Sequence, residues 1–390
     1  MTSAPSSSIT NTAIFLAICS VATAYHYYSK GVSWLSKVRN GKKSASTTEN
    51  DGKKKLVVIS GCDRGFGFLL AKTLVQESEE YLVLALTLTE QGIESLQEEA
   101  LPNSSHEKDA NPTTGRTKKL FPIRCDVTSD TDIQKVGEYC QEILQTNDAV
   151  LHAIVNNAGI TIAGDFVFFG PNSSHRDGGL ASFQHVMNVN FFGYLRLTQT
   201  LLPLMLTTSL SLTQYPRIIN LSSVCGMVSS ASNSAYNASK FAIEAWSDTL
   251  RLELEPFHIK VIKIRPGQCN TQIQSDWVNS YFENFAQAPQ SIQELYGGDA
   301  FLAKTKQSLS SMGSGNASPP KLVVDTLVHT LSSSHHSLQA SYLVGDDAQT
   351  FWRACQMLPT PIADTVKRKL RFEYPISSSS SSSSSSTLED

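Results

Sequence analysis

Short apolar runs rich in β-branched residues alternate along this chain with longer segments whose apolar residues recur at helical spacing. This alternation constrains the fold most, because strands joined by helical crossovers pair in parallel and need helices over both faces of the sheet. We therefore expect an α/β fold with a doubly wound parallel sheet, and a ligand across the carboxyl ends of its strands. The predicted strands cover residues 56–60, 81–86, 120–124, 150–155, 217–221, 259–264 and 341–344, and the predicted helices cover 66–78, 91–99, 130–146, 181–206, 234–255 and 321–333.

The first predicted strand leads directly into a glycine-rich turn that precedes a predicted helix. Glycines at Gly61, Gly65 and Gly67 would let backbone N–H groups approach a pyrophosphate at the start of that helix. Their GxxxGxG spacing differs from the GxGxxG fingerprint, so a glycine turn without a ligand is the alternative. The predicted dinucleotide contacts in this turn are Ser60, Gly61, Asp63, Arg64, Gly65, Phe66 and Gly67.

A tyrosine and a lysine stand four residues apart at the start of the predicted helix 234–255. Tyr236 and Lys240 would therefore share one face of that helix. Because an ammonium group favours a neighbouring phenolate, we expect the pKa of Tyr236 to fall from about 10 towards neutrality, where acid–base catalysis is efficient. On a surface helix the same pair would be two solvated side chains.

Further short motifs accompany the glycine turn and the Tyr-Lys pair in a fixed order: Arg124-Cys125-Asp126-Val127, Asn156-Asn157-Ala158-Gly159, Asn188-Val189-Asn190-Phe191-Phe192-Gly193, Ser222-Ser223 and Pro266-Gly267. The ordered set resembles the short-chain dehydrogenase/reductase family over about residues 54–272, and more weakly to about 370. The resemblance implies a Rossmann fold, a nicotinamide cofactor, and an enzyme that interconverts an alcohol and a carbonyl.

The resemblance also implies a role for each matched residue. Tyr236 would be the general acid/base, and Lys240 would lower its pKa and hold the nicotinamide ribose. Ser223 would bind the substrate oxygen, and Asn190 would anchor a water in a proton relay; alternatively, the serine ends a strand and the asparagine caps a helical turn. The implied catalytic residues are Asn190, Ser223, Tyr236 and Lys240, and the further implied cofactor contacts are Asp126, Val127, Asn157, Ala158, Gly159, Tyr236, Lys240, Pro266, Gly267 and Thr271. For the asparagines after the fourth strand, support of the sheet is an equal alternative.

A narrower resemblance concerns the branch that holds retinol, hydroxysteroid and 3-hydroxybutyrate dehydrogenases. It rests on Gly61-Cys62-Asp63, on the helix after Lys240, and on Ser341-Tyr342-Leu343-Val344-Gly345-Asp346-Asp347. The branch implies a lipophilic alcohol substrate under a substrate-covering loop at about 268–320. Two alternatives remain: a hydroxy-acid dehydrogenase with a cationic clamp from His185, Arg196 or the 268–320 loop, and a non-catalytic NAD(P)-binding membrane protein.

The choice between NAD and NADP depends on the residues at the tip of the second strand. That strand ends in Thr87-Leu88-Thr89-Glu90, so no carboxylate stands clearly where the ribose 2′ position is read. Arg64 would either pair with a 2′-phosphate or be a solvated turn residue. The branch resemblance favours NAD, and NADP stays open.

Composition excludes several other classes of protein. The 390-residue chain is 41% hydrophobic with a net charge of −3, which suits one α/β domain and gives no basic stripe for nucleic acid. Its seven cysteines are scattered and lack metal-ligand spacing, so we expect free thiols in a reducing compartment and no metal site.

The N-terminal segment carries an uncharged apolar stretch at residues 9–28, followed by Lys30, Lys37, Arg39, Lys42 and Lys43. This pattern predicts a membrane anchor, in the endoplasmic reticulum, with the catalytic domain facing the cytosol. Mitochondrial targeting and an amphipathic helix are the alternatives. We expect an anchor and polar linker at 1–54, a dehydrogenase domain at 55–372 and a disordered serine-rich tail at 373–390. The family resemblance implies a homodimer or homotetramer.

Overall fold

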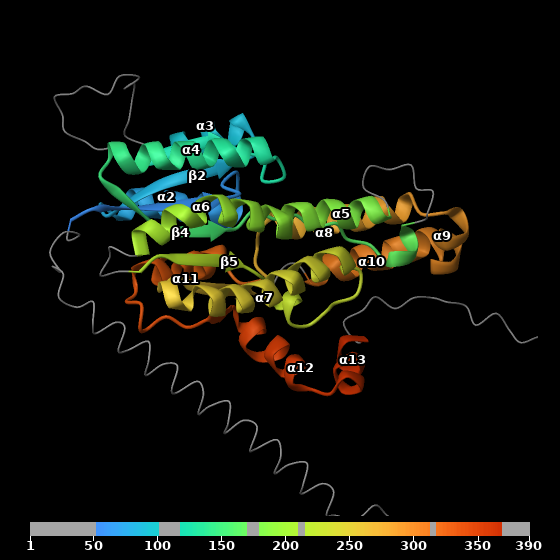
Figure 1. Cartoon of the computed structure of the whole chain (residues 1–390). Coiled ribbons are helices and arrows are strands. Elements are labelled where there is room, and N and C mark those ends of the chain that lie inside the picture. Colours follow the sequence, from blue (N-terminus) through green and yellow to red (C-terminus); the bar gives the residue numbers. More distant parts are fainter. Residues whose placement is uncertain (1–51, 101–117, 170–178, 210–214, 313–316, 369–390) are drawn as a thin grey trace, which may run out of the picture. The chain divides into compact units, whose positions relative to one another are not determined.

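The computed structural model describes residues 52–100, 118–169, 179–209, 215–312 and 317–368, and all of these except Gly52 belong to a unit that begins at Lys53 (Figure 1). The predicted N-terminal anchor and the serine-rich tail lie outside the described residues. The unit is built on a seven-stranded parallel sheet of order β3-β2-β1-β4-β5-β6-β7, which confirms the predicted fold class. The strands are β1 (Lys54–Ser60), β2 (Tyr81–Thr87), β3 (Leu120–Arg124), β4 (Ala149–Asn156), β5 (Arg217–Leu221), β6 (Lys260–Pro266) and β7 (Ser341–Val344).

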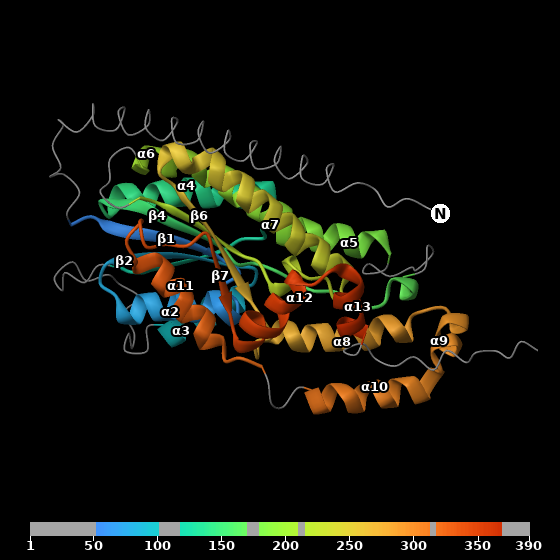
Figure 2. The same ribbon diagram turned by 90° about the horizontal axis from the view of Figure 1, so that it is seen from below.

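Helices cover both faces of this sheet, as Figure 2 shows. One layer contains α2 (Gly65–Glu77), α3 (Glu90–Ala100) and α11 (Pro320–Ser332), and the other contains α4 (Asp130–Thr146), α6 (Gly193–Ser209) and α7 (Ser234–Leu254). Strand β1 shows why both layers are needed. Val57 and Ile59 belong to one buried apolar cluster, while Leu56 and Val58 belong to the other. Successive side chains of a strand point to opposite faces, so a strand that is apolar throughout must be covered twice.

The strand order reverses between β1 and β4, because the chain first builds outward through β2 and β3 and then continues on the other side of β1. Open α/β sheets bind their ligands at such a point, outside the carboxyl ends of the strands. The glycine turn follows β1, and Asn157 follows β4. The fold therefore brings the two predicted cofactor segments to the same edge.

The predicted helix 181–206 is interrupted in the structure. It begins as α5 (Leu180–Met187), passes through the π-helical turn η2 (Asn188–Phe192) and continues as α6. A π-helical turn accommodates one more residue than an α-helical turn and is frequent at functional sites. The apolar periodicity of the sequence does not reveal it.

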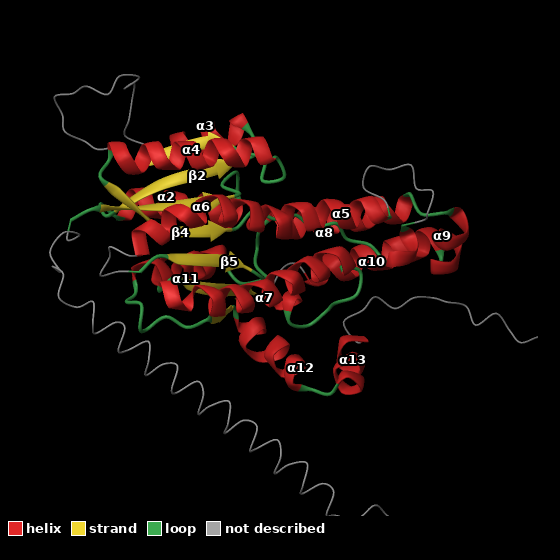
Figure 3. Cartoon of the chain, viewed as in Figure 1, coloured by secondary structure: helices red, strands yellow, loops and turns green. Residues whose placement is uncertain are grey.

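The segment 268–320, expected to be a loop, is largely helical: α8 (Gln272–Ala286), α9 (Gln290–Tyr296) and α10 (Gly298–Met312) (Figure 3). Trp277, Tyr281 and Phe285 recur every four residues on α8, and this helical signal explains the difference. The side chains that pack together here are Ala163, Phe168, Tyr281, Phe285, Ala288, Tyr296 and Phe301. The cluster joins α8, α9 and α10 to the turn after β4.

The remaining elements are short. They are η1 (Phe166–Phe168), η3 (Val224–Gly226), η4 (Glu255–Phe257), η5 (Ala348–Trp352), α12 (Arg353–Met357) and α13 (Thr360–Arg368). None of the helices in the described residues has the length and apolar character needed to cross a membrane.

Candidate active site

The glycine turn has a shape that only glycine allows. Gly61 and Gly65 adopt φ values of 71° and 65°, in the left-handed region that other residues rarely enter. A Cβ on Gly61 would lie 2.7 Å from the Cα of Ala158, and one on Gly67 would collide with the carbonyl oxygen of Gly61. A Cβ on Gly65 would meet nothing within 4 Å. The turn is therefore packed tightly on its inner side and open at Gly65.

Helix α2 begins at this open position. Its first turn contains no acidic residue, and its N-cap residue, Arg64, makes no capping hydrogen bond through its side chain. The first N–H groups of a helix have no partner within the helix and favour an anion. The residues present therefore fit the pyrophosphate of a dinucleotide.

Ser60 and Asn157 join the glycine turn to the end of β4. The Ser60 hydroxyl accepts from the backbone N–H groups of Asn157 and Ala158 at 3.0 and 3.1 Å. The Asn157 amide donates to the carbonyl oxygens of Ser60 and Gly61 at 2.9 and 3.0 Å. These contacts show the sheet-supporting role that the sequence left open for Asn157. Phe66, between the last two glycines, packs against the apolar core on that face.

Asp63 reaches the tip of β2, where the sequence shows no clear carboxylate. Its two oxygens accept from the backbone N–H groups of Leu88 and Thr89 at 2.8 and 3.0 Å, and from the Thr89 hydroxyl at 2.8 Å. A Cβ on Gly92 would lie 2.6 Å from the same carboxylate, so α3 fits closely around it. The carboxylate at the tip of β2 thus comes from the glycine turn and not from β2 itself.

Arg64 has a partner that neither sequence interpretation anticipated. Its guanidinium is 2.8 Å from a carboxylate oxygen of Asp276 on α8, with the arginine side chain 63% exposed. An exposed ion pair of this kind contributes about 0–1 kcal/mol, so it can open when another anion competes. The pair connects the glycine turn to the helical segment 272–312.

The turn after β3 is fixed by its own contacts. The Asp126 carboxylate accepts from the backbone N–H and the hydroxyl of Thr128 at 2.9 and 2.8 Å. Val127 is buried, and a Cβ on Gly193 would lie 2.9 Å from its side chain. Asp126 and Val127 therefore lie in a rigid turn against the start of α6.

Ser223, Tyr236 and Lys240 come together from the end of β5 and the first turns of α7. The Ser223 hydroxyl accepts from the N–H of Cys225 at 3.1 Å and is close enough to the Tyr236 phenol to lower its pKa. The Lys240 Nζ lies 5.4 Å from the centre of the Tyr236 ring and donates to the carbonyl oxygen of Leu221 at 2.7 Å. A hydroxyl, a phenol and an amine from distant parts of the sequence thus share one site.

The expected fall in the pKa of Tyr236 does not occur in the protein alone, and that prediction is wrong. Burial raises the pKa of the phenol above its ordinary value of 10.0, and the Ser223 hydroxyl opposes this without reversing it. Burial also lowers the pKa of Lys240 to about 8. Removal from water disfavours the charged form of both groups. The ammonium also bonds to Leu221 and not to the phenol.

Asn190 occupies the π-helical turn and is fully buried. Its amide accepts from the N–H of Ile160 at 2.8 Å, donates to the carbonyl oxygen of the same residue at 3.0 Å, and donates to the Ser239 hydroxyl at 3.0 Å. Ser239 in turn donates to the carbonyl oxygen of Tyr236 at 2.8 Å. Asn190 therefore ties the backbone after Gly159 to the turn of α7 that separates the tyrosine from the lysine.

The sequence interpretation missed Tyr194, four residues after Asn190 on the same helical face. Its hydroxyl donates to the Leu221 carbonyl oxygen at 3.2 Å, so it shares that acceptor with Lys240. Its ring centre lies 5.7 Å from the Lys240 Nζ. The four-residue spacing between Asn190 and Tyr194 is the sequence signal that could have identified this tyrosine.

Asp347 is a second residue that sequence reasoning missed, although it lies in the tail that carried the narrower resemblance. Its carboxylate accepts from the N–H of Gln268 at 2.8 Å and from the Trp352 indole at 3.1 Å. A Cβ on Gly267 would collide with it. The tail thus fixes the turn after Pro266, and Thr271 lies at the N-cap of α8 just beyond.

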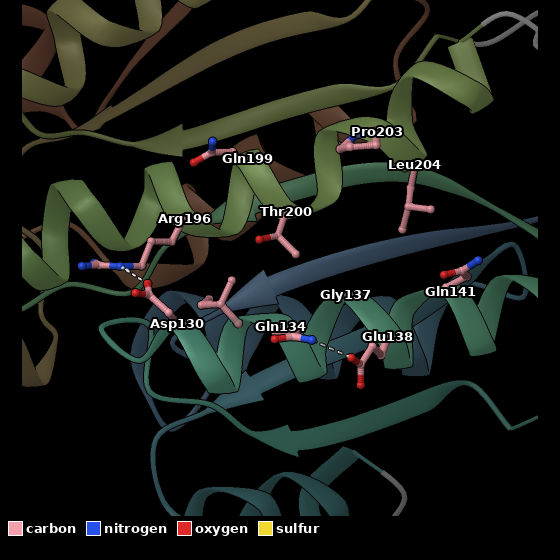
Figure 4. A pocket seen from close by; sticks show the side chains of 11 residues that line it. Asp130, Gln134, Gly137, Glu138, Gln141, Arg196, Gln199, Thr200, Pro203 and Leu204 are labelled. Atoms are coloured by element: carbon pink, nitrogen blue, oxygen red, sulfur yellow. Dashed lines mark hydrogen bonds and ion pairs between the residues drawn. The ribbon is translucent and has the colours of Figure 1, made fainter.

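Neither His185 nor Arg196, the two residues suggested as a cationic clamp, lines a described cavity together with Tyr236. Arg196 donates to Asp130 at 2.8 Å in a groove between α4 and α6, shown in Figure 4. His185 lines a hollow with Leu180, Phe183 and Phe192 on α5 and η2. No member of the catalytic set lines either cavity.

The cysteines of the described segments, Cys62, Cys125, Cys140, Cys225, Cys269 and Cys355, form no disulfide. Within those segments, no group of three or more His, Cys, Asp or Glu side chains is arranged to hold a metal ion.

Comparison with known proteins identifies relatives over most of the chain. A family profile described as short chain dehydrogenase matches residues 55–281, more than half of the sequence. Retinol dehydrogenase 7 of Rattus norvegicus is 32% identical over 320 residues, which cover 80% of this chain and 87% of that protein. 17-beta-hydroxysteroid dehydrogenase type 6 of Bos taurus is 33% identical over 319 residues, with the same coverage.

Solved structures show the same fold at lower identity. A short-chain dehydrogenase from Streptomyces avermitilis aligns with a TM-score of 0.55 at 22% identity, covering 82% of this chain and 95% of that one. A short chain dehydrogenase from Burkholderia cenocepacia in complex with NADP aligns with a TM-score of 0.53 at 16% identity, covering 80% and 98%. A 3-ketoacyl-(acyl-carrier-protein) reductase from Brucella melitensis complexed with NADH aligns with a TM-score of 0.53 at 17% identity, covering 75% and 96%.

Proposed function

The chain belongs to the short-chain dehydrogenase family, and on that premise we propose that it interconverts an alcohol and a carbonyl on a lipophilic substrate such as a retinoid or a steroid. The observation that carries this proposal is the group formed by Ser223, Tyr236 and Lys240, at the same edge of the sheet as the glycine turn. A nicotinamide cofactor, NAD or NADP, supplies the hydride chemistry when bound. Every residue that the family pattern places in catalysis is present in this chain.

Cofactor binding, substrate binding and proton transfer would be carried out by residues of this chain. The glycine turn at 61–67 and the start of α2 would hold the pyrophosphate, and Lys240 would hold the nicotinamide ribose. The Ser223 hydroxyl would donate to the substrate oxygen, while the Tyr236 hydroxyl would take its proton during oxidation and return it during reduction. With a pKa of about 8, Lys240 can be charged at neutral pH, and its ammonium would stabilise the phenolate that forms.

One observation supports a lipophilic substrate over a small hydroxy acid. Arg196 is engaged by Asp130, and His185 lines a separate hollow. A small anion needs a cationic clamp, whereas a lipid needs apolar walls. The names of the relatives, a retinol dehydrogenase and a hydroxysteroid dehydrogenase, agree with this choice.

For the cofactor we propose NAD. The Asp63 carboxylate at the tip of β2 would accept from a ribose hydroxyl and repel a 2′-phosphate. Arg64 would favour the phosphate, but Asp276 compensates its charge. Replacement of Asp63 by Asn should therefore shift the ratio of kcat/KM for NAD over NADP by about tenfold towards NADP.

The control for this prediction is Arg64→Ala, which removes the competing cation and should move the same ratio towards NAD. Initial rates with each nucleotide at saturating alcohol measure the ratio. An unchanged ratio in Asp63→Asn would show that this carboxylate only fixes the glycine turn.

The test of the proposed activity is a panel of alcohols assayed with the purified full chain in detergent. Retinol, steroid alcohols, long-chain alcohols and 3-hydroxybutyrate are each incubated with NAD and with NADP, and the absorbance of the reduced cofactor is followed. Turnover of retinol or a steroid, with none for 3-hydroxybutyrate, is the expected result. Binding of nucleotide without turnover of any alcohol would favour the non-catalytic alternative.

The location and assembly of the protein are further proposals. We propose membrane association through residues 9–28, in the endoplasmic reticulum with the catalytic domain in the cytosol, and the mitochondrion is the alternative. We also propose a homodimer or homotetramer through the helices around α5 and α7, which expose Leu180, Phe192 and Phe241. Protease protection in sealed microsomes tests the first proposal, and light scattering in detergent tests the second.

A further inference from the structure

Four ionisable side chains follow one another at four-residue intervals along α7: Tyr236, Lys240, Glu244 and Asp248. Residues at that spacing share one face of a helix. Lys240 is 4% exposed and Glu244 is 8% exposed, so a buried carboxylate stands one turn beyond the buried lysine. A buried charge is costly unless it is paired and hydrogen-bonded.

Glu244 is paired through β6. Arg265 donates to both of its oxygens, from Nε at 2.9 Å and from Nη2 at 2.7 Å, and the Lys263 Nζ lies 2.9 Å from one of them. Arg265 also donates to the Ser341 hydroxyl at 3.1 Å. Glu244 therefore connects α7 to β6, directly before the turn at Pro266 and Gly267, and through Arg265 to β7.

The same carboxylate lies behind the turn that carries Ser223. A Cβ on Gly226 would lie 2.8 Å from the Ser222 hydroxyl, 2.9 Å from the Lys240 carbonyl oxygen and 3.0 Å from the Glu244 Cγ. The turn after β5 thus packs on α7 between the lysine and the glutamate. A side chain larger than hydrogen at Gly226 would push this turn away from α7.

The charges of this cluster do not balance without Glu244. Lys240, Lys263 and Arg265 supply three cations, of which the two lysines are almost fully buried. Asp248 pairs with Lys263 at 2.7 Å, but its side chain is 53% exposed. Glu244 is the buried carboxylate of the set, and its loss would leave the cations facing one another in a medium of low dielectric constant.

We propose that Glu244 is a positioning residue that keeps Lys240 charged beneath Tyr236, so that proton transfer at the phenol depends on a carboxylate that touches neither substrate nor cofactor. This inference rests on the proposed function for its catalytic consequence. The effect of Glu244 on the charge of Lys240 can be measured without substrate.

The titration behaviour of the two groups agrees with this geometry. Burial lowers the pKa of Lys240, while Cys225 on the turn after β5 and, to a smaller extent, Glu244 raise it. Burial raises the pKa of the Cys225 thiol above its ordinary value of 9.0, so near neutral pH Glu244 is the ionised group of the two. Burial also raises the pKa of Glu244, but its hydrogen bonds with Arg265 and its other partners outweigh this and hold that pKa below the ordinary value. Glu244 therefore stays ionised at every pH at which Lys240 titrates.

The direct test is an NMR titration of the full chain, labelled with ¹⁵N-lysine and held in detergent micelles. Lys240→Met identifies the Lys240 signal. In Glu244→Gln the titration midpoint of Lys240 should fall by about one pH unit, because a nearby opposite charge has been removed. In Arg265→Gln it should rise, because one of the cations that compensate Glu244 is gone. Asp248→Asn is the matched control, since it removes the exposed partner of Lys263 and should leave the midpoint unchanged.

The Lys240 midpoint is expected to shift in opposite directions in Glu244→Gln and Arg265→Gln, and this distinguishes the proposal from a purely structural role. If Glu244 only holds β6 to α7, then Glu244→Gln and Arg265→Gln will both lower the melting temperature and leave the Lys240 midpoint in place, which overturns the proposal. Should Glu244→Gln not fold, the upward shift in Arg265→Gln and an unshifted midpoint in Glu244→Asp are still required.

A second measurement separates this inference from the proposed function. With the best alcohol of the panel, kcat of Glu244→Gln should fall at unchanged KM by about twofold at pH 7 and by about tenfold at pH 9, because lowering a lysine pKa of about 8 by one unit reduces its charged fraction by these factors. If the lysine midpoint shifts but no alcohol is oxidised by the unmodified chain, the proposed function fails and the electrostatic inference stands. If alcohols are oxidised and the midpoint does not move, the inference fails and the proposed function stands.

Discussion

Strand β5 has a buried cation at each of its ends, and the two cations are held very differently. At its amino end, Arg217 is 1% exposed and donates to the carbonyl oxygens of Thr330, Leu331 and Ser333 at 2.5, 2.6 and 3.2 Å. At its carboxyl end, Lys240 is almost as deeply buried but donates to one carbonyl oxygen, that of Leu221. One end binds its cation to a helix terminus, and the other holds it beside a phenol.

This difference indicates that Arg217 has a structural role, whereas Lys240 is suited to catalysis. Arg217 lies against the last carbonyls of α11, where a helix presents its negative end and its unpaired acceptors. An arginine stays charged throughout the working pH range, so this contact does not switch. An ammonium has three donors, and Lys240 gives one of them to Leu221. With a pKa of about 8, it can also change its charge near neutral pH.

The sharpest test of this contrast is Lys240→Met. Turnover should fall by about 100-fold to 1000-fold, because the charge that stabilises a phenolate is lost. The free energy of unfolding should stay the same or increase, because a buried ammonium has been replaced by an apolar side chain. Steady-state rates and urea denaturation measure the two quantities. Destabilisation with normal turnover would reverse the roles of the two cations.

Arg217→Met should have the opposite pattern. The carbonyl oxygens at the end of α11 lose a charged donor, so the free energy of unfolding should fall by about 3 kcal/mol. Turnover per folded molecule should change by less than about twofold, since no part of the catalytic set contacts Arg217. A loss of turnover in correctly folded Arg217→Met would remove the distinction between the two ends.

The smallest expected effect concerns His152, which shares the Leu331 carbonyl with Arg217 at 2.9 Å. Burial and the Arg217 charge lower its pKa from 6.5 to about 3. The unfolded chain therefore binds this proton more readily, so its contribution to stability is present above pH 6.5 and is lost as the pH falls from there towards 3. By about pH 5 the loss should reach about 2 kcal/mol. In His152→Gln the melting temperature should fall less steeply over that range, whereas an equally steep decline would assign the acid sensitivity to other groups.

The sequence predicts those features of the fold and the site that depend on local patterns of residues. The seven strands follow from short apolar runs, and the parallel sheet follows from the helices between them. The meeting of Ser223, Tyr236 and Lys240 follows from the ordered motifs, since parallel strands bring their carboxyl ends to one edge. Composition alone would not have produced either result.

The sequence was insufficient where contacts between distant segments decide the outcome. The carboxylate at the tip of β2 comes from Asp63, 25 residues before its partner Leu88. The π-helical turn around Asn190 is stabilised by a contact with Ile160, 30 residues away. The pKa of Tyr236 depends on burial, which spacing on one helix does not report. In each case the deciding partner lies on another element.

The measurement that tests the central claim most directly is a comparison of the unmodified chain with Tyr236→Phe. The change removes one hydroxyl and leaves the ring, the glycine turn and Lys240 in place. Nucleotide affinity, measured by fluorescence, should stay within about twofold, while alcohol oxidation should fall by about 100-fold or more. Unchanged oxidation in Tyr236→Phe would contradict the assignment of this phenol as the proton-transferring group.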